Sequence, residues 1–271
     1  MSKSSNSDQS FDAILEFLED HCEFHAGCYE RSYLERRINA RLRRTDREDY
    51  SGYYELLEAD NGEREDLVDA LSINVTEFFR NPELWSALVP FLADRIEAEG
   101  TISCWSAACA DGREPYSLAM LANEEEELNE RKIEILATDI DQDALEAARD
   151  GVYHDLRTVD IGEQLEPLSD FEQYIEHDDG MYAVKPSIRS LVQFRHHDLV
   201  EGDSPGEFDF VLCRNLLIYI DTDAKRAILE TLTDSLKPGG YLVIGMSETI
   251  PRDMFDALEP VDRSRRIYKR R

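Results

Sequence analysis

Apolar residues in the first 72 positions recur at the three- and four-residue spacing of α-helices. The recurring sets are Phe11, Ile14, Leu15 and Leu18; Leu34, Ile38 and Leu42; Tyr53, Leu56 and Leu57; and Leu67, Ala70 and Leu71. No strand-like alternation interrupts them between residues 8 and 72. The pattern therefore predicts an all-α N-terminal domain, which we place at residues 1–75.

From about residue 101, short apolar runs alternate with helical stretches, which is typical of a parallel sheet covered by helices. The expected strands are Ile102–Trp105, Ile133–Ala137, Leu191–Phe194, Phe208–Cys213 and Tyr241–Gly245. The expected helices are 83–98, Pro115–Glu127, Gln142–Arg149 and Asp223–Leu236. The pattern predicts an α/β domain over residues 76–271.

Several shorter segments refine this α/β domain. Residues 151–190 fit no strand–helix unit, and we expect an insertion with a small antiparallel sheet around Met181–Val184. The tail Arg265–Arg271 is expected to add a final antiparallel strand. Lys237-Pro-Gly-Gly240 is expected to stop a helix and turn into the next strand. Pro82 suits a first helical turn, and Asn81 is the expected N-cap.

Charge changes the picture most. The chain has 30 basic and 59 acidic residues in 271 positions, a net charge of −29. Such a surface repels nucleic acid and anionic membranes. Molar salt screens its self-repulsion, so we expect a halophilic source, with an ordinary acidic protein as the alternative.

The rest of the composition bears on where the protein is located and on whether it binds a metal. No apolar run approaches the roughly 18 residues of a membrane span, and the polar start lacks the apolar stretch of a signal peptide. We therefore expect a cytoplasmic protein. Five cysteines without a C-x-x-C pair argue against a metal site.

Acidic residues follow the first two expected strands. Ligands bind beyond the carboxyl ends of parallel strands, where the strand order reverses. Glu114, in the first turn after Trp105–Gly112, suits an ammonium group; its alternative role is to stabilise the helix dipole. Asp139 is placed to accept hydrogen bonds from ribose hydroxyls, and Asp141 to cap the next helix. Two capping carboxylates are the alternative.

The next strands also end in polar residues. Asp198 is a candidate acceptor for an adenine amino group, with Leu199 as an apolar wall. Arg214 and Asn215 follow the apolar strand 208–213 and are candidate cofactor contacts. Tyr219 lies four residues beyond Asn215, within one helical turn. These polar residues could instead be buried and satisfied.

A polar segment joins the two expected domains. Asn74, Thr76 and Arg80 are offset by two and four positions in it. The planar guanidinium of Arg80 can bind a carboxylate through two hydrogen bonds. A plain surface arginine is the alternative.

Together these segments resemble the chemotaxis receptor methyltransferase family, CheR. The matching motifs are Asn74-Val-Thr-Glu-Phe-Phe-Arg-Asn-Pro82, Glu114-Pro-Tyr-Ser-Leu-Ala-Met120, Ala137-Thr-Asp-Ile-Asp141, Cys213-Arg-Asn-Leu-Leu-Ile-Tyr-Ile-Asp221 and Leu236-Lys-Pro-Gly-Gly-Tyr-Leu242. The resemblance implies a Rossmann-like S-adenosylmethionine (SAM)-dependent methyltransferase sheet with an N-terminal all-α domain and a small β insertion. It also implies methyl transfer to glutamate side chains of methyl-accepting chemotaxis receptors.

The resemblance assigns roles residue by residue. The SAM pocket would be lined by Asn74, Thr76, Arg80, Glu114, Asp139, Asp198, Leu199 and Asn215, with Arg214 beside them. Arg80 and Tyr219 would lie nearest the transferred methyl. The chain departs from the family at Ala108, Ala110 and Arg113, where Gly, Ser and Glu are usual. Arg113 therefore predicts an altered cofactor affinity.

Arginines are concentrated between residues 31 and 47. Seven of the chain's 30 basic residues lie there. Arg37, Arg41 and Arg44 fall on one helical stripe, away from the apolar positions. We expect this stripe to dock on the acidic helices of a receptor, so that the protein meets the membrane only through that receptor. Internal pairing with acidic residues is the alternative.

Two rival functions remain open from sequence. A methyltransferase for nucleic acid or a small molecule is opposed by the total charge and by Arg-Asn-Leu-Leu at residues 214–217, where a base methylase has Asn/Asp-Pro-Pro-Tyr/Phe. A non-enzymatic SAM sensor is opposed by the joint presence of Arg80, Asp139, Asn215 and Tyr219.

Overall fold

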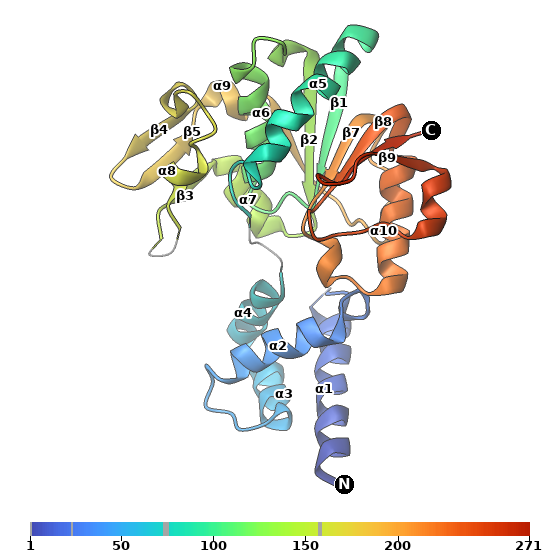
Figure 1. Cartoon of the computed structure of the whole chain (residues 1–271). Helices are drawn as coiled ribbons and strands as arrows, with labels where there is room; N and C mark the ends of the chain where they lie inside the picture. The colour runs from blue at the N-terminus through green and yellow to red at the C-terminus, as the bar shows by residue number, and fades with distance from the viewer. Residues whose placement is uncertain (1, 23, 73–75, 157–158) are drawn as a thin grey trace. The chain divides into compact units, whose positions relative to one another are not determined.

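The computed structural model describes residues 2–22, 24–72, 76–156 and 159–271, with side chains from residue 10 onward. The chain divides into two compact units. The first, here called the helical unit, comprises Met1–Ile73 and Leu217–Ala227. The second, the sheet unit, comprises Asn74–Leu216 and Ile228–Arg271 (Figure 1).

The helical unit contains the four helices that the apolar spacing predicts. They are α1 (Ser2–His21), α2 (Arg31–Leu42), α3 (Tyr50–Ala59) and α4 (Asn61–Leu71). Asp49 and Asp60 cap α3 and α4 by accepting hydrogen bonds from backbone N–H groups of the first turn. The apolar faces of the four helices meet in one core.

Across the part of the chain that the structure describes, no helix combines the length and the apolar character that a membrane span requires.

A segment distant in sequence completes the helical unit. Residues 217–227 include a 3₁₀ turn, Leu217–Tyr219, and the start of α10 (Thr222–Asp234). Tyr29 and Ile220 form an isolated antiparallel bridge. The N–H of Asp221 donates to the carbonyl of Cys28 at 2.9 Å. Sequence patterns did not indicate this assignment, because it depends on pairing across about 190 residues.

The sheet unit is built on a seven-stranded sheet with the order β6-β2-β1-β7-β8-β10-β9. The strands are β1 (Ile102–Ala107), β2 (Ile133–Asp139), β6 (Val192–His196), β7 (Phe208–Cys213), β8 (Leu236–Ile244), β9 (Leu258–Asp262) and β10 (Ile267–Arg270). The first five run parallel, while β10 pairs antiparallel to β8 and β9. The strand order reverses between β1 and β7, so ligands are expected at the carboxyl ends of these strands.

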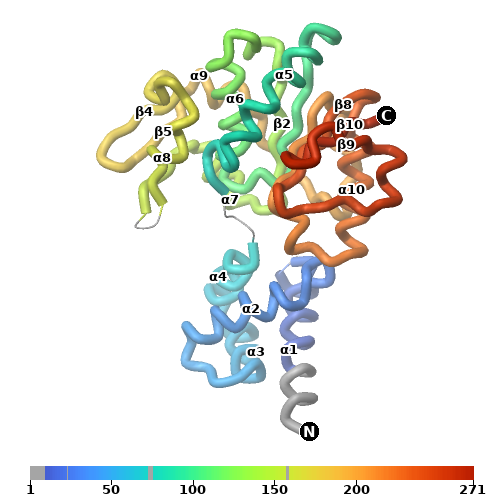
Figure 2. Tube along the Cα trace, in the orientation of Figure 1, coloured from blue at the N-terminus to red at the C-terminus, as the bar shows by residue number. Residues whose placement is uncertain are grey.

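Helices and a small second sheet surround this core. The principal helices are α5 (Pro82–Glu99), α6 (Arg113–Glu124) and α7 (Gln142–Asp150); α6 and α7 pack against β2 and β6. The insertion contains β3 (Val152–His154), β4 (Ile175–Asp178) and β5 (Met181–Val184), with β5 in the middle. Two single-turn helices, α8 (Ile161–Gln164) and α9 (Pro186–Arg189), flank it (Figure 2).

The predicted fold class is confirmed, with two local corrections. Lys237–Gly240 lies inside β8 rather than forming a turn before it, and a register shift in the β7–β8 pairing accommodates it. Asn81 sits at the N-cap position of α5 but caps nothing, because its φ is +60° and its side chain does not bond the helix. Pro82 begins α5 as expected.

An ion cluster anchors the amino end of the sheet, opposite the expected ligand edge. The carboxylate of Asp209, fully buried on β7, binds Arg95 from α5, Lys237 at 2.8 Å and the N–H of Ser103 at 2.9 Å. Burial alone raises the pKa of Asp209, but these donors outweigh it and hold the pKa below its ordinary value. Arg95 therefore has a structural role far from the carboxyl edge.

Candidate functional site

Glu114 is a candidate ligand residue that follows β1. It lies in the first turn of α6 and is largely buried. One carboxylate oxygen accepts a hydrogen bond from the hydroxyl of Ser106 on β1 at 2.9 Å. The other pairs with Arg214 at 3.1 Å. Each oxygen keeps a lone pair, so Glu114 can still accept from a ligand ammonium.

Asp139 ends β2 and joins the same edge. Its two oxygens accept from the N–H of Ala110, at 2.7 Å, and of Asp141, at 3.0 Å. Burial raises the pKa of Asp139, and these backbone donors partly offset the rise. Asp141 caps α7 through the N–H of Ala144, as expected. Asp139 is therefore not used as a cap and remains a candidate ribose ligand.

The loop between β1 and α6 brings its backbone close to Asp139. Ala108 and Ala110 adopt φ values of +56° and +48°, a region that costs a non-glycine residue about 1–2 kcal/mol. Gly112, at φ +87°, has no room for a side chain, since a Cβ there would lie 2.8 Å from that of Ala148. The two alanines therefore keep the tight loop geometry at an energetic cost.

Arg214 and Asn215 follow β7 on the other side of the switch point. The side chain of Arg214 is 1% exposed, and it binds Glu114, the carbonyl of Arg80 and Asn81. Asn215 adopts a φ of +66°, and its buried Oδ1 has no hydrogen-bond partner among the described residues. This amide oxygen is therefore able to accept a hydrogen bond from a ligand.

Arg113, in the first turn of α6, is held by several contacts. It donates to the carbonyl of Thr76 at 3.2 Å, pairs with Asp111 at 3.2 Å, and lies over the rings of Phe78 and Tyr153. The expectation that Arg113 alters cofactor affinity stays a prediction. The contacts of Arg113 tie the segment before α5 to the insertion.

The other residues predicted to contact the cofactor lie in the turn after β6 and in the segment before α5. Asp198 binds the N–H of Val200 at 2.7 Å in the turn after β6, and Leu199 is buried there. Thr76 precedes α5 and is linked to α6 through its carbonyl. Asn74 lies outside the described residues.

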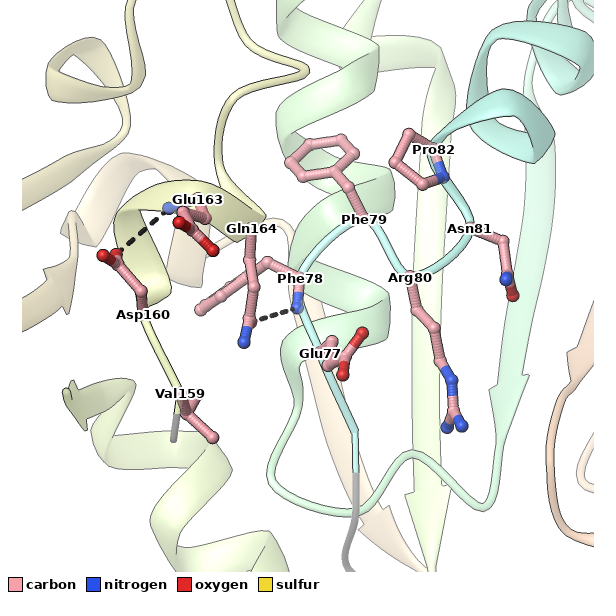
Figure 3. Close-up of a pocket in the computed structure, with 10 residues that line it drawn as sticks. All are labelled: Glu77, Phe78, Phe79, Arg80, Asn81, Pro82, Val159, Asp160, Glu163 and Gln164. Atoms are coloured by element: carbon pink, nitrogen blue, oxygen red, sulfur yellow. Dashed lines mark hydrogen bonds between the residues drawn. The ribbon is translucent and has the colours of Figure 1, made fainter. Parts of the chain in front are cut away.

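Arg80 borders a hollow of about 310 Å³ between the segment before α5 and α8 of the insertion (Figure 3). The lining residues are Glu77, Phe78, Phe79, Arg80, Asn81, Pro82, Val159, Asp160, Glu163 and Gln164. Phe79 and Arg80 extend in opposite directions from this segment (Figure 3). Gln164 accepts from the N–H of Phe78 at 2.9 Å, which fixes one wall to the other.

Tyr219 belongs to the helical unit. Its ring centroid lies 4.9 Å from that of Tyr33, and its carbonyl accepts from the N–H of Glu30 at 2.8 Å. The helical unit therefore holds this tyrosine, although Asn215, four residues earlier, belongs to the sheet unit. Its place nearest the transferred methyl stays a prediction.

The three arginines expected to dock on a receptor differ in their burial and in their partners within the protein. Arg41 is mostly buried and pairs with Glu63 and Asp66, each at 2.6 Å, so internal pairing applies to it. Arg37 is partly buried, with its guanidinium over the ring of Tyr33. Arg44 is exposed. Four further arginines of this stretch are also exposed: Arg31, which pairs with Asp12, and Arg36, Arg43 and Arg47.

Comparisons with known proteins also divide the chain near residue 73, although they place residues 217–227 in the second domain. The model of the CheR methyltransferase all-alpha domain matches residues 9–72, and that of the CheR methyltransferase SAM binding domain matches residues 74–266. The chain belongs to the CheR methyltransferase family. Both the helical segment and the sheet with its insertion are thus accounted for by one family.

CheR relatives match over nearly the whole chain. Chemotaxis protein methyltransferase 1 of Pseudomonas aeruginosa is 35% identical, covering 89% of this chain and 90% of its own. The Listeria monocytogenes and Vibrio cholerae enzymes are 34% and 33% identical, covering 82% and 90% of this chain, and 83% and 90% of their own. SAM-bound CalS10, an amino pentose methyltransferase from Micromonospora echinaspora, is only a distant structural match, at 17% identity and TM-score 0.35 over 62% of this chain and 52% of its own.

The carboxyl edge of this CheR sheet fits SAM. Glu114 offers a carboxylate for the ammonium, and Asp139 offers one for the ribose. The Oδ1 of Asn215 supplies an acceptor that the protein leaves unused. Three acceptors of this kind suit a ligand that carries an ammonium, hydroxyls and an amino group.

Replacing Ala108 with Gly is expected to stabilise the protein by about 1 kcal/mol, because glycine adopts a positive φ without the steric cost. Urea unfolding would measure the change. The matched control is Ala122→Gly in α6, where a helical glycine and a lost buried methyl should destabilise by about 1–2 kcal/mol. Equal destabilisation by both substitutions would contradict the strain assigned to the loop.

Proposed function

We propose that this chain transfers the methyl group of SAM to glutamate side chains of methyl-accepting chemotaxis receptors. The products are a glutamate methyl ester and S-adenosylhomocysteine. The observation that carries the proposal is the match of both CheR family models, in order, along a chain whose Glu114, Asp139 and Asn215 converge on one sheet edge. A nucleic-acid substrate is disfavoured by the net charge of −29.

The acceptor determines what the protein must do. A glutamate side chain has a pKa of about 4.3, so it is ionised and nucleophilic at neutral pH without a general base. SAM, when bound, supplies a methyl group on a positively charged sulfur. A carboxylate oxygen can attack that methyl carbon, and the sulfur leaves as the neutral thioether. The protein's residues then contribute by positioning, which can lower a barrier by about 7–11 kcal/mol.

Each candidate residue has a role in that positioning. Glu114 would hold the ammonium of SAM, and Asp139 would accept hydrogen bonds from the ribose hydroxyls. Asn215 would accept a hydrogen bond from a donor on the nucleoside. Asp198 and Leu199 would face the adenine, with Asn74 and Thr76 lining the pocket from the segment before α5. These roles are in keeping with the carboxyl-edge location of the acidic residues.

Two residues would serve the acceptor. Arg80 would hold the incoming carboxylate through its guanidinium, and Tyr219 would orient it by a hydrogen bond. The packing of Tyr219 on Tyr33 makes the helical unit responsible for its orientation. Loss of the helical unit should therefore affect turnover even where SAM still binds.

The exposed arginines of the helical unit would dock on the receptor. Arg36, Arg43, Arg44 and Arg47 are exposed in a chain of net charge −29, and receptor methylation helices carry acidic glutamates. Opposite charges of this kind steer association and set orientation. Arg41 takes part less directly, because Glu63 and Asp66 already pair with it. Arg37 does so because it is partly buried; both Arg36 and Arg37 lie over the ring of Tyr33.

Incubation with labelled SAM and receptor-containing membranes at molar salt is expected to give alkali-labile methyl label on the receptor. Molar salt screens the self-repulsion of the acidic surface, in keeping with a halophilic source. DNA and RNA form the comparison arms. Base-stable label on nucleic acid, with none released from receptor by alkali, would defeat the proposal.

Reversing Arg36, Arg43 and Arg44 to Glu should raise the KM for receptor about tenfold or more while leaving SAM binding intact. The physical reason is that like charges replace complementary ones at the docking face. Arg263→Glu, at an exposed arginine of the sheet unit, is the matched control and should leave the KM unchanged. Parallel loss of receptor methylation and SAM affinity would count against a docking role.

A further inference from the structure

The segment from Thr76 to Asn81 is fastened along its length to α6, α8 and the end of β7. At its start, the carbonyl of Thr76 accepts from Arg113 of α6. In its middle, the N–H groups of Phe78 and Phe79 donate to Gln164 and to Ser117 of α6, each at 2.9 Å. The segment that carries Arg80 is thus bound to the helix that carries Glu114.

Arg214 fastens the far end of the same segment. One terminal nitrogen, Nη2, donates to the carbonyl of Arg80 at 2.7 Å and to Oδ1 of Asn81 at 2.8 Å. The other, Nη1, donates to Glu114 at 3.1 Å. The guanidinium also lies over the ring of Trp85 in α5, with its carbon 5.7 Å from the ring centroid. Arg214 therefore connects Glu114 to Arg80 directly.

Most of the donors of Arg214 are engaged within the protein. Its side chain is 1% exposed, and its two terminal nitrogens make three hydrogen bonds, to Glu114, Arg80 and Asn81. The Nε–H is buried and has no partner among the described residues. A planar fork is needed for this arrangement, because a lysine ammonium is a single point that cannot span the three acceptors in the same geometry.

The conformation of Asn81 supports the same conclusion. Its φ of +60° and the missing helix cap both cost stability. The compensating bond runs from Arg214 to the side-chain oxygen of Asn81. Asn81 therefore serves the attachment to Arg214 rather than the start of α5.

We propose that Arg214 is a positioning residue, which sets the place of Arg80 by holding its backbone to the carboxylate of Glu114. The alternative is the sequence-based expectation that Arg214 contacts the cofactor, which stays a prediction. The inference rests on the proposed function, since it concerns the residue assigned to the acceptor carboxylate. Its structural part, the fastening of residues 76–81, can be measured without any turnover.

The test compares Arg214→Lys with the wild-type protein in two measurements. Amide hydrogen exchange of the full chain should become faster in peptides covering residues 76–82 and remain unchanged in β1 and β2. In receptor methylation at saturating SAM and receptor, kcat should fall about tenfold or more, because small misplacements of a binding group are costly. The affinity for S-adenosylhomocysteine should stay within about threefold, because the lysine ammonium can keep the ion pair with Glu114 while losing the bonds to Arg80 and Asn81.

Two further variants complete the design. Arg95→Lys, a partly buried arginine of the Asp209 cluster, is the matched control and should leave kcat and the exchange of residues 76–82 unchanged. Asn81→Ala keeps Arg214 and removes one acceptor, so it should change both quantities in the same direction as Arg214→Lys but less. If Arg214→Lys fails to fold, Asn81→Ala still tests the positioning role.

The outcomes separate the two proposals. Wild-type exchange of residues 76–82 in Arg214→Lys and Asn81→Ala would overturn the positioning role. Weakened S-adenosylhomocysteine affinity with unchanged kcat would also overturn it and restore a cofactor contact. Absence of methyl transfer by the wild-type protein would defeat the proposed function, while the exchange comparison would still decide whether Arg214 holds the segment.

Discussion

The buried pair between Glu114 and Arg214 is the interaction on which the candidate site depends. Burying two charges is costly unless each is paired and hydrogen-bonded, and here Ser106, Asn81 and the carbonyl of Arg80 supply the additional bonds. The pair joins the first turn of α6, the helix that follows β1, to the end of β7, and the strand order reverses between β1 and β7. The pair therefore lies at the sheet edge where an α/β fold binds its ligand.

Two units divide the proposed reaction. The sheet unit holds the carboxylates and the unused amide oxygen of Asn215, which suit SAM. The helical unit holds the exposed arginines, which suit an acidic receptor, and Tyr219, which suits the acceptor carboxylate. Residues 217–227 belong to the helical unit although they directly follow β7 and Asn215 in sequence. The chain therefore passes from Asn215, proposed for the cofactor, to Tyr219, proposed for the acceptor, within four positions.

Local pattern was sufficient for the main helices and the parallel strands, but it missed β9 and the start of β8. Motifs indicated the ligand edge. Apolar spacing indicated four helices and the parallel strands, and the acidic residues Glu114 and Asp139 marked the correct strand ends. Pairings between distant residues were not visible. Nothing adjacent to Arg41 in sequence shows its ion pair with Glu63, and nothing near Asn81 shows that it bonds Arg214 instead of capping α5. Such partners are set by tertiary packing, which a one-dimensional pattern does not contain.

Calorimetric titration of the full chain with S-adenosylhomocysteine at molar salt tests the central claim most directly, because it requires neither receptor nor turnover. We predict saturable one-to-one binding, weakened about tenfold or more by Asp139→Asn through loss of a charge-assisted hydrogen bond. Absence of binding to both S-adenosylhomocysteine and SAM by the folded protein would contradict a cofactor site at this edge.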